Sequence, residues 1–319
     1  MHMHAVLLAV VLSTTSVHFV ADEARAVLAI LDLRAAKQPV PDAAWETLFT
    51  SEGYVRLKKR ELAMHRPFDE ETFRKFVMSD ELLARRELLA RTLDNWLKAD
   101  LTHAAALAHA YLPSNASIQA NVYSVIKPAK NSFVFEQSAI FMYVDDIPRD
   151  EFEATIAHEM HHIGYASACR ESGPPLPENL QKLAMWISAF GEGFATLAAA
   201  GGPEGVAQRK ADVRAEWEKQ LPRFDANFAE LAAFFEAVLD GRLSGDTADK
   251  RAFEFFGLVG PWYTVGWKMA VVIEKTLGRD ALIAAMCDPR HFFATYNRAA
   301  AKSGEKLPLW PETLVKAFE

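Results

Sequence analysis

Residues 158–162 of this chain read HEMHH, so His158, Glu159 and His162 have the H-E-x-x-H spacing that binds zinc on a helix. Residues four apart on an α-helix lie one turn above each other, and both imidazoles can therefore reach one metal ion. Glu159 projects toward the open side of that ion, where its carboxylate can take a proton from water. The chemistry that this pattern favours is hydrolysis assisted by zinc.

The motif lies in a segment that is predicted to be helical. The segment follows Pro148, has acidic residues at its start, and offers Phe152, Ile156 and Ile163 for an apolar face. His161 lies one position away from the metal face, which favours a role beside the ligands or in solvent over metal binding. The alternative interpretation is a surface or core helix that carries three histidines without a metal.

A catalytic zinc site needs a third protein ligand and one position left for water. The next histidine after His162 is the distant His291, so a carboxylate is the natural third ligand. Glu192 is the best placed, because it lies in a second apolar helical stretch between Gly191 and Gly193. Glycines inside a helix cost about 1 kcal/mol each relative to alanine, and close approach of this helix to the zinc helix would explain them.

Two other acidic residues compete with Glu192 for the role of third ligand. These are Glu171 and Glu178, but residues 172–177 between them are rich in proline and read as a loop, a less precise place for a ligand. Glu192 itself has another interpretation, as an N-cap or an exposed acid beside a break in the helix.

Three segments together resemble the gluzincin clan of zinc metallopeptidases, of which thermolysin is the familiar member. They are residues 158–165 (HEMHHIGY), 191–196 (GEGFAT) and 260–270 (GPWYTVGWKMA), and they are more closely similar to an uncharacterised family of zinc-dependent peptidases. The likeness covers roughly residues 110 to 300. It implies a zincin-like fold with one Zn²⁺ ion on His158, His162 and Glu192, and Glu159 as general base and acid in peptide-bond hydrolysis.

Two further positions bear on this resemblance. Gluzincins usually have Asp or Asn one turn after the third ligand, and this chain departs from that pattern with Thr196.

The tetrahedral intermediate of hydrolysis also needs a hydrogen-bond donor, which is worth about 3 kcal/mol of barrier. Our candidate donor is Tyr263, which opens a helix after a proline and precedes Gly266, where the helix could pack closely. The alternatives are Tyr165, Tyr296 and His291, or a packed core position for Tyr263.

Three β-rich segments precede the zinc helix, at residues 117–126, 131–135 and 139–144. They read as strands of one small sheet. In gluzincins an edge strand just before the zinc helix pairs with extended substrate, and residues 131–133 resemble the start of that strand. The resemblance implies a peptide or protein substrate that binds by strand addition. An ordinary scaffold sheet without a substrate role is the alternative.

Composition and charge exclude some classes of partner. A formal net charge of −7 argues against nucleic acid, and the basic run at residues 56–60 is followed at once by Glu61, which favours a solvated helix face. Residues 5–12 are apolar and precede small residues, as in a signal peptide, so residues 1–16 predict export to the periplasm or outside the cell. This run is too short for a stable membrane span.

Two features of the export hypothesis stay open in the sequence. If the apolar run is instead the first helix or strand of the fold, the protein is cytoplasmic. Cys169 and Cys287 allow one disulfide in an exported protein, and two buried thiols otherwise.

The overall pattern predicts an α+β fold that is predominantly helical. A helical N-terminal region spans residues 17–115, with helices expected at 21–36, 42–64, 69–78 and 80–110, and a zincin-like metallopeptidase domain spans residues 116–319. The function predicted for this arrangement is a zinc-dependent peptidase. The alternatives are a zincin-fold binding protein, a zinc hydrolase that is not a peptidase, and a purely structural metal with a fourth protein ligand.

Overall fold

The computed structural model describes residues 15–129, 132–136, 138–169, 175–205 and 211–318. Helices dominate it, and one four-stranded sheet lies among them, so the predicted fold class, α+β and predominantly helical, is confirmed. No helix in these ranges has the length and apolar character needed to cross a bilayer. Of the expected leader, residues 1–14 lie outside the described residues.

The N-terminal part of the chain is built from one strand and seven helices within the described ranges. They are β1 (Thr15–Val20), α1 (Asp22–Ala35), α2 (Asp42–Thr50), α3 (Glu52–Ala63), α4 (Glu70–Val77), α5 (Asp80–Ala84), α6 (Arg86–Trp96) and α7 (Leu101–His109). The last two residues of the expected leader, Thr15 and Ser16, are the first residues of β1 and align with β2.

The remaining strands precede a long series of helices. The strands are β2 (Ile118–Val125), β3 (Phe133–Phe135) and β4 (Ala139–Tyr143). The helices are α8 (Arg149–Ala168), α9 (Glu178–Ile187), η1 (Ser188–Phe190), α10 (Gly191–Ala199), α11 (Ala211–Gln220), η2 (Leu221–Arg223), α12 (Phe224–Leu239), α13 (Gly245–Glu254), α14 (Pro261–Leu277), α15 (Arg279–Cys287), α16 (Pro289–Ser303) and α17 (Glu312–Ala317).

Two of the expected N-terminal helices are divided in the structure. The segment 42–64 is broken at Ser51, whose extended backbone starts α3 and whose hydroxyl accepts a hydrogen bond from the Tyr54 amide at 3.4 Å. The segment 80–110 forms three helices, the last of which is capped by Asp100. Apolar periodicity continues across these breaks, because successive helices all bury a face, and periodicity alone therefore missed the capping residues.

The sheet has the strand order β1-β2-β4-β3. β1, β2 and β4 are parallel, and β3 runs antiparallel to β4 at one edge. One face of the sheet packs on α8, where Phe19 of β1 meets Phe152 with ring centroids 5.9 Å apart. The opposite face is covered by α3, whose Arg56 lies over the ring of Tyr123 in β2. The sheet therefore lies between α8 and α3, while α6 packs directly on α8, where Trp96 stacks on Phe152 with ring centroids 4.4 Å apart.

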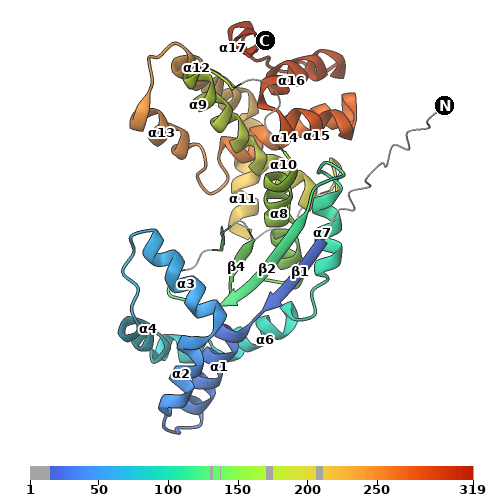
Figure 1. Cartoon of the computed structure of the whole chain (residues 1–319). Helices are drawn as coiled ribbons and strands as arrows, with labels where there is room; N and C mark the ends of the chain where they lie inside the picture. The colour runs from blue at the N-terminus through green and yellow to red at the C-terminus, as the bar shows by residue number, and fades with distance from the viewer. Residues whose placement is uncertain (1–14, 130–131, 137, 170–174, 206–210, 319) are drawn as a thin grey trace, which may run out of the picture.

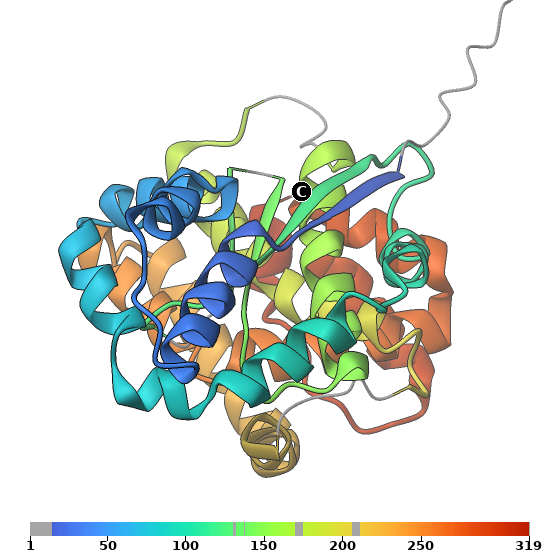
Figure 2. The same cartoon turned by 90° about the horizontal axis from the view of Figure 1, so that it is seen from below.

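Figure 1 shows the sheet and the N-terminal helices in one half of the molecule and the C-terminal helices in the other, with α8 and α10 between them. Figure 2 shows the same layers from below. The core of the C-terminal half is aromatic, since Phe190 and Phe235 each contact both Trp262 and Trp310. This packing supports the start of α14, where Trp262 is fully buried.

Candidate metal centre

The H-E-x-x-H motif lies on α8, as predicted. This helix starts directly after Pro148, carries Asp150 and Glu151 in its first turn, and buries Phe152 and Ile156 among other apolar side chains. Acidic residues at a helix N-terminus complement the helix dipole, and the apolar positions fix which face is inward. The packing of these apolar side chains therefore sets the direction in which the histidines point.

The structure brings His158, His162 and Glu192 together. Oε2 of Glu192, in the first turn of α10, lies 3.1 Å from Nε2 of His158 and 3.5 Å from Nε2 of His162. The two Nε2 atoms are 3.2 Å apart. Within the described ranges this is the one group of three His, Cys, Asp or Glu side chains placed to hold a metal. Glu178 begins α9 outside the group, and Glu171 lies outside the described residues.

The spacing of the three donor atoms fits a zinc ion. A tetrahedral zinc with bonds of about 2.0–2.1 Å to nitrogen and oxygen separates its ligand atoms by about 3.3 Å. The three observed separations, 3.1, 3.2 and 3.5 Å, lie around that value. The side chains of His162 and Glu192 are 30% and 21% exposed, so the cluster is reached from one side.

The electrostatics of the cluster suit a cation. Burial lowers the pKa of His158, so this imidazole is neutral near pH 7. Burial raises the pKa of Glu192, but the charge of His162 and the hydrogen bond with His158 outweigh burial and hold the pKa well below its usual range. For His162, burial lowers the pKa, and the charge of Glu192 more than offsets this. The carboxylate is therefore ionised, which is the state that binds a metal.

Thr196 contacts the outer side of His158. Its hydroxyl donates to the Glu192 carbonyl at 2.9 Å, and the same oxygen lies 3.5 Å from Nδ1 of His158. Because the hydroxyl proton is directed to the carbonyl, the oxygen lone pairs can accept from Nδ1–H, and with a metal ion in place of the hydrogen bond to Glu192 the Nε2 lone pair would be directed at that ion. The position at which the chain departs from the gluzincin pattern thus still carries a partner for the histidine.

The glycines around Glu192 have a different explanation from the one expected. A Cβ on Gly193 would lie 2.1 Å from the backbone nitrogen of Trp267 and 2.4 Å from the carbonyl carbon of Gly266, both in α14. A Cβ on Gly191 would meet nothing within 4 Å. Gly193 therefore does allow a close approach between helices. The helix that it approaches is α14, so the prediction that the glycines serve contact with α8 was wrong. The predicted close packing at Gly266 is confirmed.

This helix contact also brings Tyr263 to the cluster. Tyr263 lies in the first turn of α14, and its ring is stacked on that of His158 at a centroid distance of 6.4 Å and an interplanar angle of 15°. Glu159 is half-buried on α8, directly after His158. The structure thus brings His158, His162, Glu192 and the ring of Tyr263 together, and the charge of Glu159 acts on both histidines.

The other candidates lie in different surroundings. The hydroxyl of Tyr165 donates to the Met286 carbonyl at 3.5 Å, and the hydroxyl of the buried Tyr296 donates to the Pro308 carbonyl at 3.1 Å. His291 is 72% exposed, with Nε2 3.9 Å from a carboxylate oxygen of Asp288. His161 is 1% exposed, so a solvent-facing role is excluded, and burial lowers its pKa to about 3.

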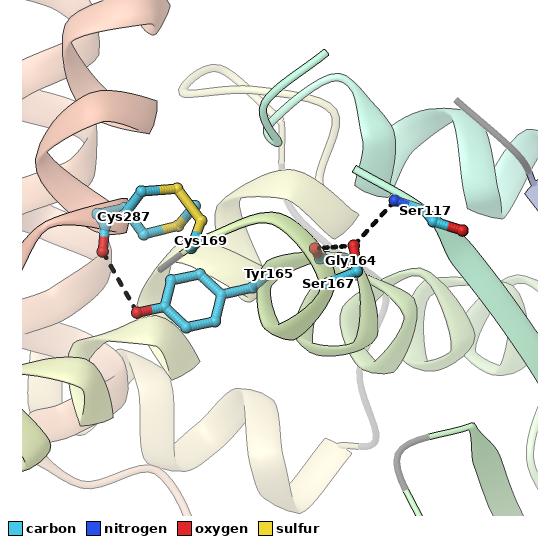
Figure 3. The surroundings of a disulfide bond; sticks show 7 residues. Ser117, Gly164, Tyr165, Ser167, Cys169 and Cys287 are labelled. Carbon is cyan, nitrogen blue, oxygen red and sulfur yellow. Dashed lines mark hydrogen bonds between the residues drawn. A yellow bond between two sulfur atoms is a disulfide. The ribbon is translucent and has the colours of Figure 1, made fainter. Parts of the chain in front are cut away.

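A disulfide between Cys169 and Cys287 joins the end of α8 to the C-terminal helices. Of the two states that the sequence left open, one disulfide or two buried thiols, the structure has the disulfide. Cys169 is the C-cap of α8 and Cys287 ends α15 (Figure 3). The hydrogen bond from Tyr165 to the Met286 carbonyl also joins α8 to α15, so the C-terminal end of α8 is anchored by two contacts.

Comparison with known proteins agrees with this centre. No curated protein and no solved structure matches the chain. A family model described as "Putative zinc dependent peptidase (DUF5700)" matches residues 43–305, a span that includes both helices of the cluster and Tyr263. The chain therefore belongs to the DUF5700 family of putative zinc dependent peptidases.

Proposed function

We propose that this protein is a gluzincin-type peptidase that hydrolyses peptide bonds with one zinc ion bound by His158, His162 and Glu192. The observation that carries the proposal is the triangle of donor atoms, 3.1 to 3.5 Å on a side, built from two helices whose positions are fixed by packing. Within the described ranges the cluster has three ligands, whereas a purely structural zinc site has four. This supports a catalytic centre with one position open to water.

Each residue of the cluster has a distinct role in the proposed reaction. Bound zinc supplies a Lewis acid that lowers the pKa of water toward about 7. Glu159 takes the proton from the attacking water and later passes it to the leaving amine. The hydroxyl of Tyr263 donates to the oxygen on which negative charge develops. Thr196 holds the imidazole of His158 in the tautomer that turns Nε2 toward the ligand cluster.

The sheet supports a peptide as the substrate. β3 is the last strand in the order β1-β2-β4-β3, it runs antiparallel to β4, and it precedes the zinc helix in the chain. An extended peptide could add to this edge through main-chain hydrogen bonds and so place one carbonyl at the cluster. Residue 131, at the expected start of the strand, lies outside the described residues.

Export is part of the proposal. Disulfides persist in oxidising compartments and are rare in the cytosol of most organisms, so the Cys169–Cys287 bond supports a periplasmic or secreted protein. The apolar run at residues 5–12 would then belong to a leader.

The test combines metal analysis with cleavage of a quenched peptide library. We expect one zinc per chain in the wild type and in Glu159→Gln, and its loss in His162→Ala and Glu192→Ala. Cleavage by Glu159→Gln should fall by about 10²- to 10⁴-fold, the usual contribution of a general base. His291→Ala is the matched control, because this exposed histidine lies outside the cluster and its variant should keep both zinc and activity.

Three outcomes would contradict the proposal in different ways. Full activity in Glu159→Gln would exclude this glutamate as the base. Zinc retained without any cleavage in the wild type would favour a zincin-fold binding protein or a hydrolase of another bond. A wild type that binds no zinc would remove the basis of the assignment.

A further inference from the structure

The basic run of α3 is only in part the solvated helix face that the sequence predicts, since the side chain of Lys59 is 66% exposed but Arg60 is buried. Arg60 is 8% exposed, and its guanidinium lies 3.9 Å above the ring of Phe133 in the edge strand β3. Arg56 lies 5.4 Å above the ring of Tyr123 in β2. α3 therefore covers the face of the sheet that is opposite α8, and two of its cations, Arg56 and Arg60, contact aromatic rings of the strands.

The rings under α3 form a continuous row across the sheet. Tyr123 stacks on Phe141 of β4, and Phe141 stacks on Phe133 of β3, with centroid distances of 4.9 Å in both pairs. These rings are cross-strand neighbours in the register of the sheet. The row packs β3 laterally against β4, next to α3.

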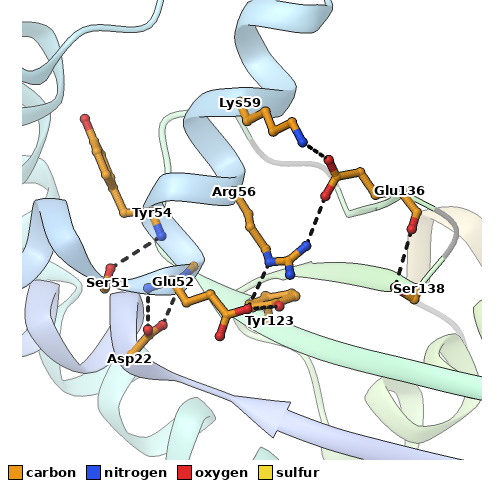
Figure 4. A network of polar contacts seen from close by, with 10 residues as sticks. Asp22, Ser51, Glu52, Tyr54, Arg56, Lys59, Tyr123, Glu136 and Ser138 are labelled. Carbon is orange, nitrogen blue, oxygen red and sulfur yellow. Dashed lines mark hydrogen bonds and ion pairs between the residues drawn. The ribbon is translucent and has the colours of Figure 1, made fainter.

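Glu136 follows β3 and lies between two cations of α3. Its carboxylate accepts hydrogen bonds from Arg56 at 3.0 Å and from Lys59, as Figure 4 shows. Arg56 is in turn held by Glu52 at 2.9 Å, and Glu52 also accepts a hydrogen bond from the Tyr123 hydroxyl. The hydrogen bond from Lys59 lowers the pKa of Glu136, so this carboxylate is ionised near pH 7. Two cations and two anions give the group no net charge.

The same glutamate lines a hollow of about 390 Å³ beside the zinc helix. Ile163 and Ala166 of α8 form part of its wall. Ile163 directly follows His162. Ala166 lies about one turn beyond His162, which is about 6 Å along the helix axis. Ser117, Gln119, Ser138 and Ser167 complete the wall, so Glu136 is the one ionisable side chain among the described residues that line it.

We propose that this hollow is a substrate subsite for an uncharged side chain, and that Arg56 and Lys59 set this preference by neutralising Glu136. The inference rests on the proposed peptidase activity. The amide of Gln119 in the wall can exchange hydrogen bonds with a polar group, while the balanced ion pairs give no net attraction to a cation or an anion. Removing one member of the ion pairs should therefore create a charge preference of predictable sign.

The test compares kcat/KM for three peptides that carry Lys, Gln or Glu at one position, with that position moved in turn along the peptide. The wild type should cleave the Gln peptide best, and the Lys and Glu peptides equally well within about twofold, because a site of no net charge offsets the desolvation of neither charge. Glu136→Gln leaves an excess positive charge and should favour the Glu peptide over the Lys peptide by about fivefold, while Lys59→Gln should favour the Lys peptide by about as much. High salt should reduce both preferences, since the charges are partly exposed.

Two further variants separate this role from a general effect on stability. The swap of Lys59→Glu with Glu136→Lys restores the opposite charges and should return the preference to that of the wild type. Lys75→Gln removes an exposed partner of Glu71 on α4 and should change no preference. If the wild type cleaves the peptides and every variant shows the same charge preference as the wild type, the inference about the hollow is wrong, whereas the proposed peptidase function is unaffected. A wild type that cleaves none of the peptides would refute the proposed function and this inference with it.

Discussion

Replacing Gly193 by alanine tests the helix contact on which the metal centre depends. The added Cβ would lie 2.1 Å from the nitrogen of Trp267, 2.4 Å from the carbonyl carbon of Gly266 and 2.6 Å from the carbonyl oxygen of Tyr263. All three atoms belong to the backbone of α14, so no side chain can rotate away. The substitution can be accommodated only if α10 and α14 separate.

The size of the effect follows from these distances. Ordinary contact begins at 3.4 Å, so the helices must part by roughly 1.3 Å at this point. Overpacking of this kind costs about 1–3 kcal/mol. For a chain of 319 residues with a typical unfolding entropy, this corresponds to a fall in Tm of about 2 to 4 °C.

The effect on metal binding should be larger than the effect on stability. Glu192 precedes Gly193, and its carboxylate lies 3.1 Å from His158 on a different helix. Metal sites tolerate shifts of about 0.2 Å in ligand distance, which is much less than the expected movement of α10. We expect zinc affinity to fall by about 10- to 100-fold, the range found when groups that orient metal ligands are lost.

Gly191→Ala is the matched control, because a Cβ there would meet nothing within 4 Å and the backbone is already helical. That variant should keep zinc affinity and should gain at most about 1 kcal/mol from helix propensity. Both variants can be compared by thermal unfolding of the apo protein and by competition for zinc with a chromophoric chelator. If Gly193→Ala matched the control in Tm and in zinc affinity, the reasoning from the α10–α14 contact would be refuted.

Three more predictions concern the surroundings of the centre. Cys287→Ser removes the bond to Cys169 and should lower the unfolding free energy by about 2–5 kcal/mol, which thermal unfolding under oxidising conditions would detect and an unchanged Tm would contradict. Thr196→Val should weaken zinc affinity by about tenfold through His158, and Thr196→Ser should restore it; equal affinities in a chelator titration would exclude this role. Burial lowers the pKa of Lys127 from 10.5 to about 8, so the unfolded chain binds more protons between these values and stability attributable to this group should rise with pH there. Denaturant unfolding should show this slope in the wild type and lose it in Lys127→Met.

The local features of the centre could be predicted from the sequence because their causes are local. The spacing of His158 and His162 matters only on a helix, and Pro148 with the acids after it starts that helix at the right place. Glu192 was identifiable because few carboxylates occur in apolar helical segments, and burying one needs a partner. Such signals are contained within one turn or one helix.

Features that depend on a distant partner were not predictable in the same way. The glycine pattern around Glu192 indicated a close approach, but nothing in the pattern specifies whether α8 or α14 is the neighbour. The basic run of α3 reads as an exposed face because the aromatic row beneath it belongs to strands more than fifty residues later. The pairing of Cys169 with Cys287 likewise depends on how α8 meets α15.

The arrangement of the two ligand helices explains why these distant contacts matter for the chemistry. His158 and His162 are positioned by α8, which packs on the sheet and is anchored at its end by the disulfide. Glu192 and Thr196 are positioned by α10, which packs against α14 with backbone contacts that only glycine permits. The candidate metal centre therefore lies where the two halves of the molecule meet, and the distances between its donor atoms depend on the packing of both halves. A substitution in the disulfide at the end of α8 or in the α10–α14 contact should therefore displace a helix and change the distances between the donor atoms, although neither contact involves the ligand side chains.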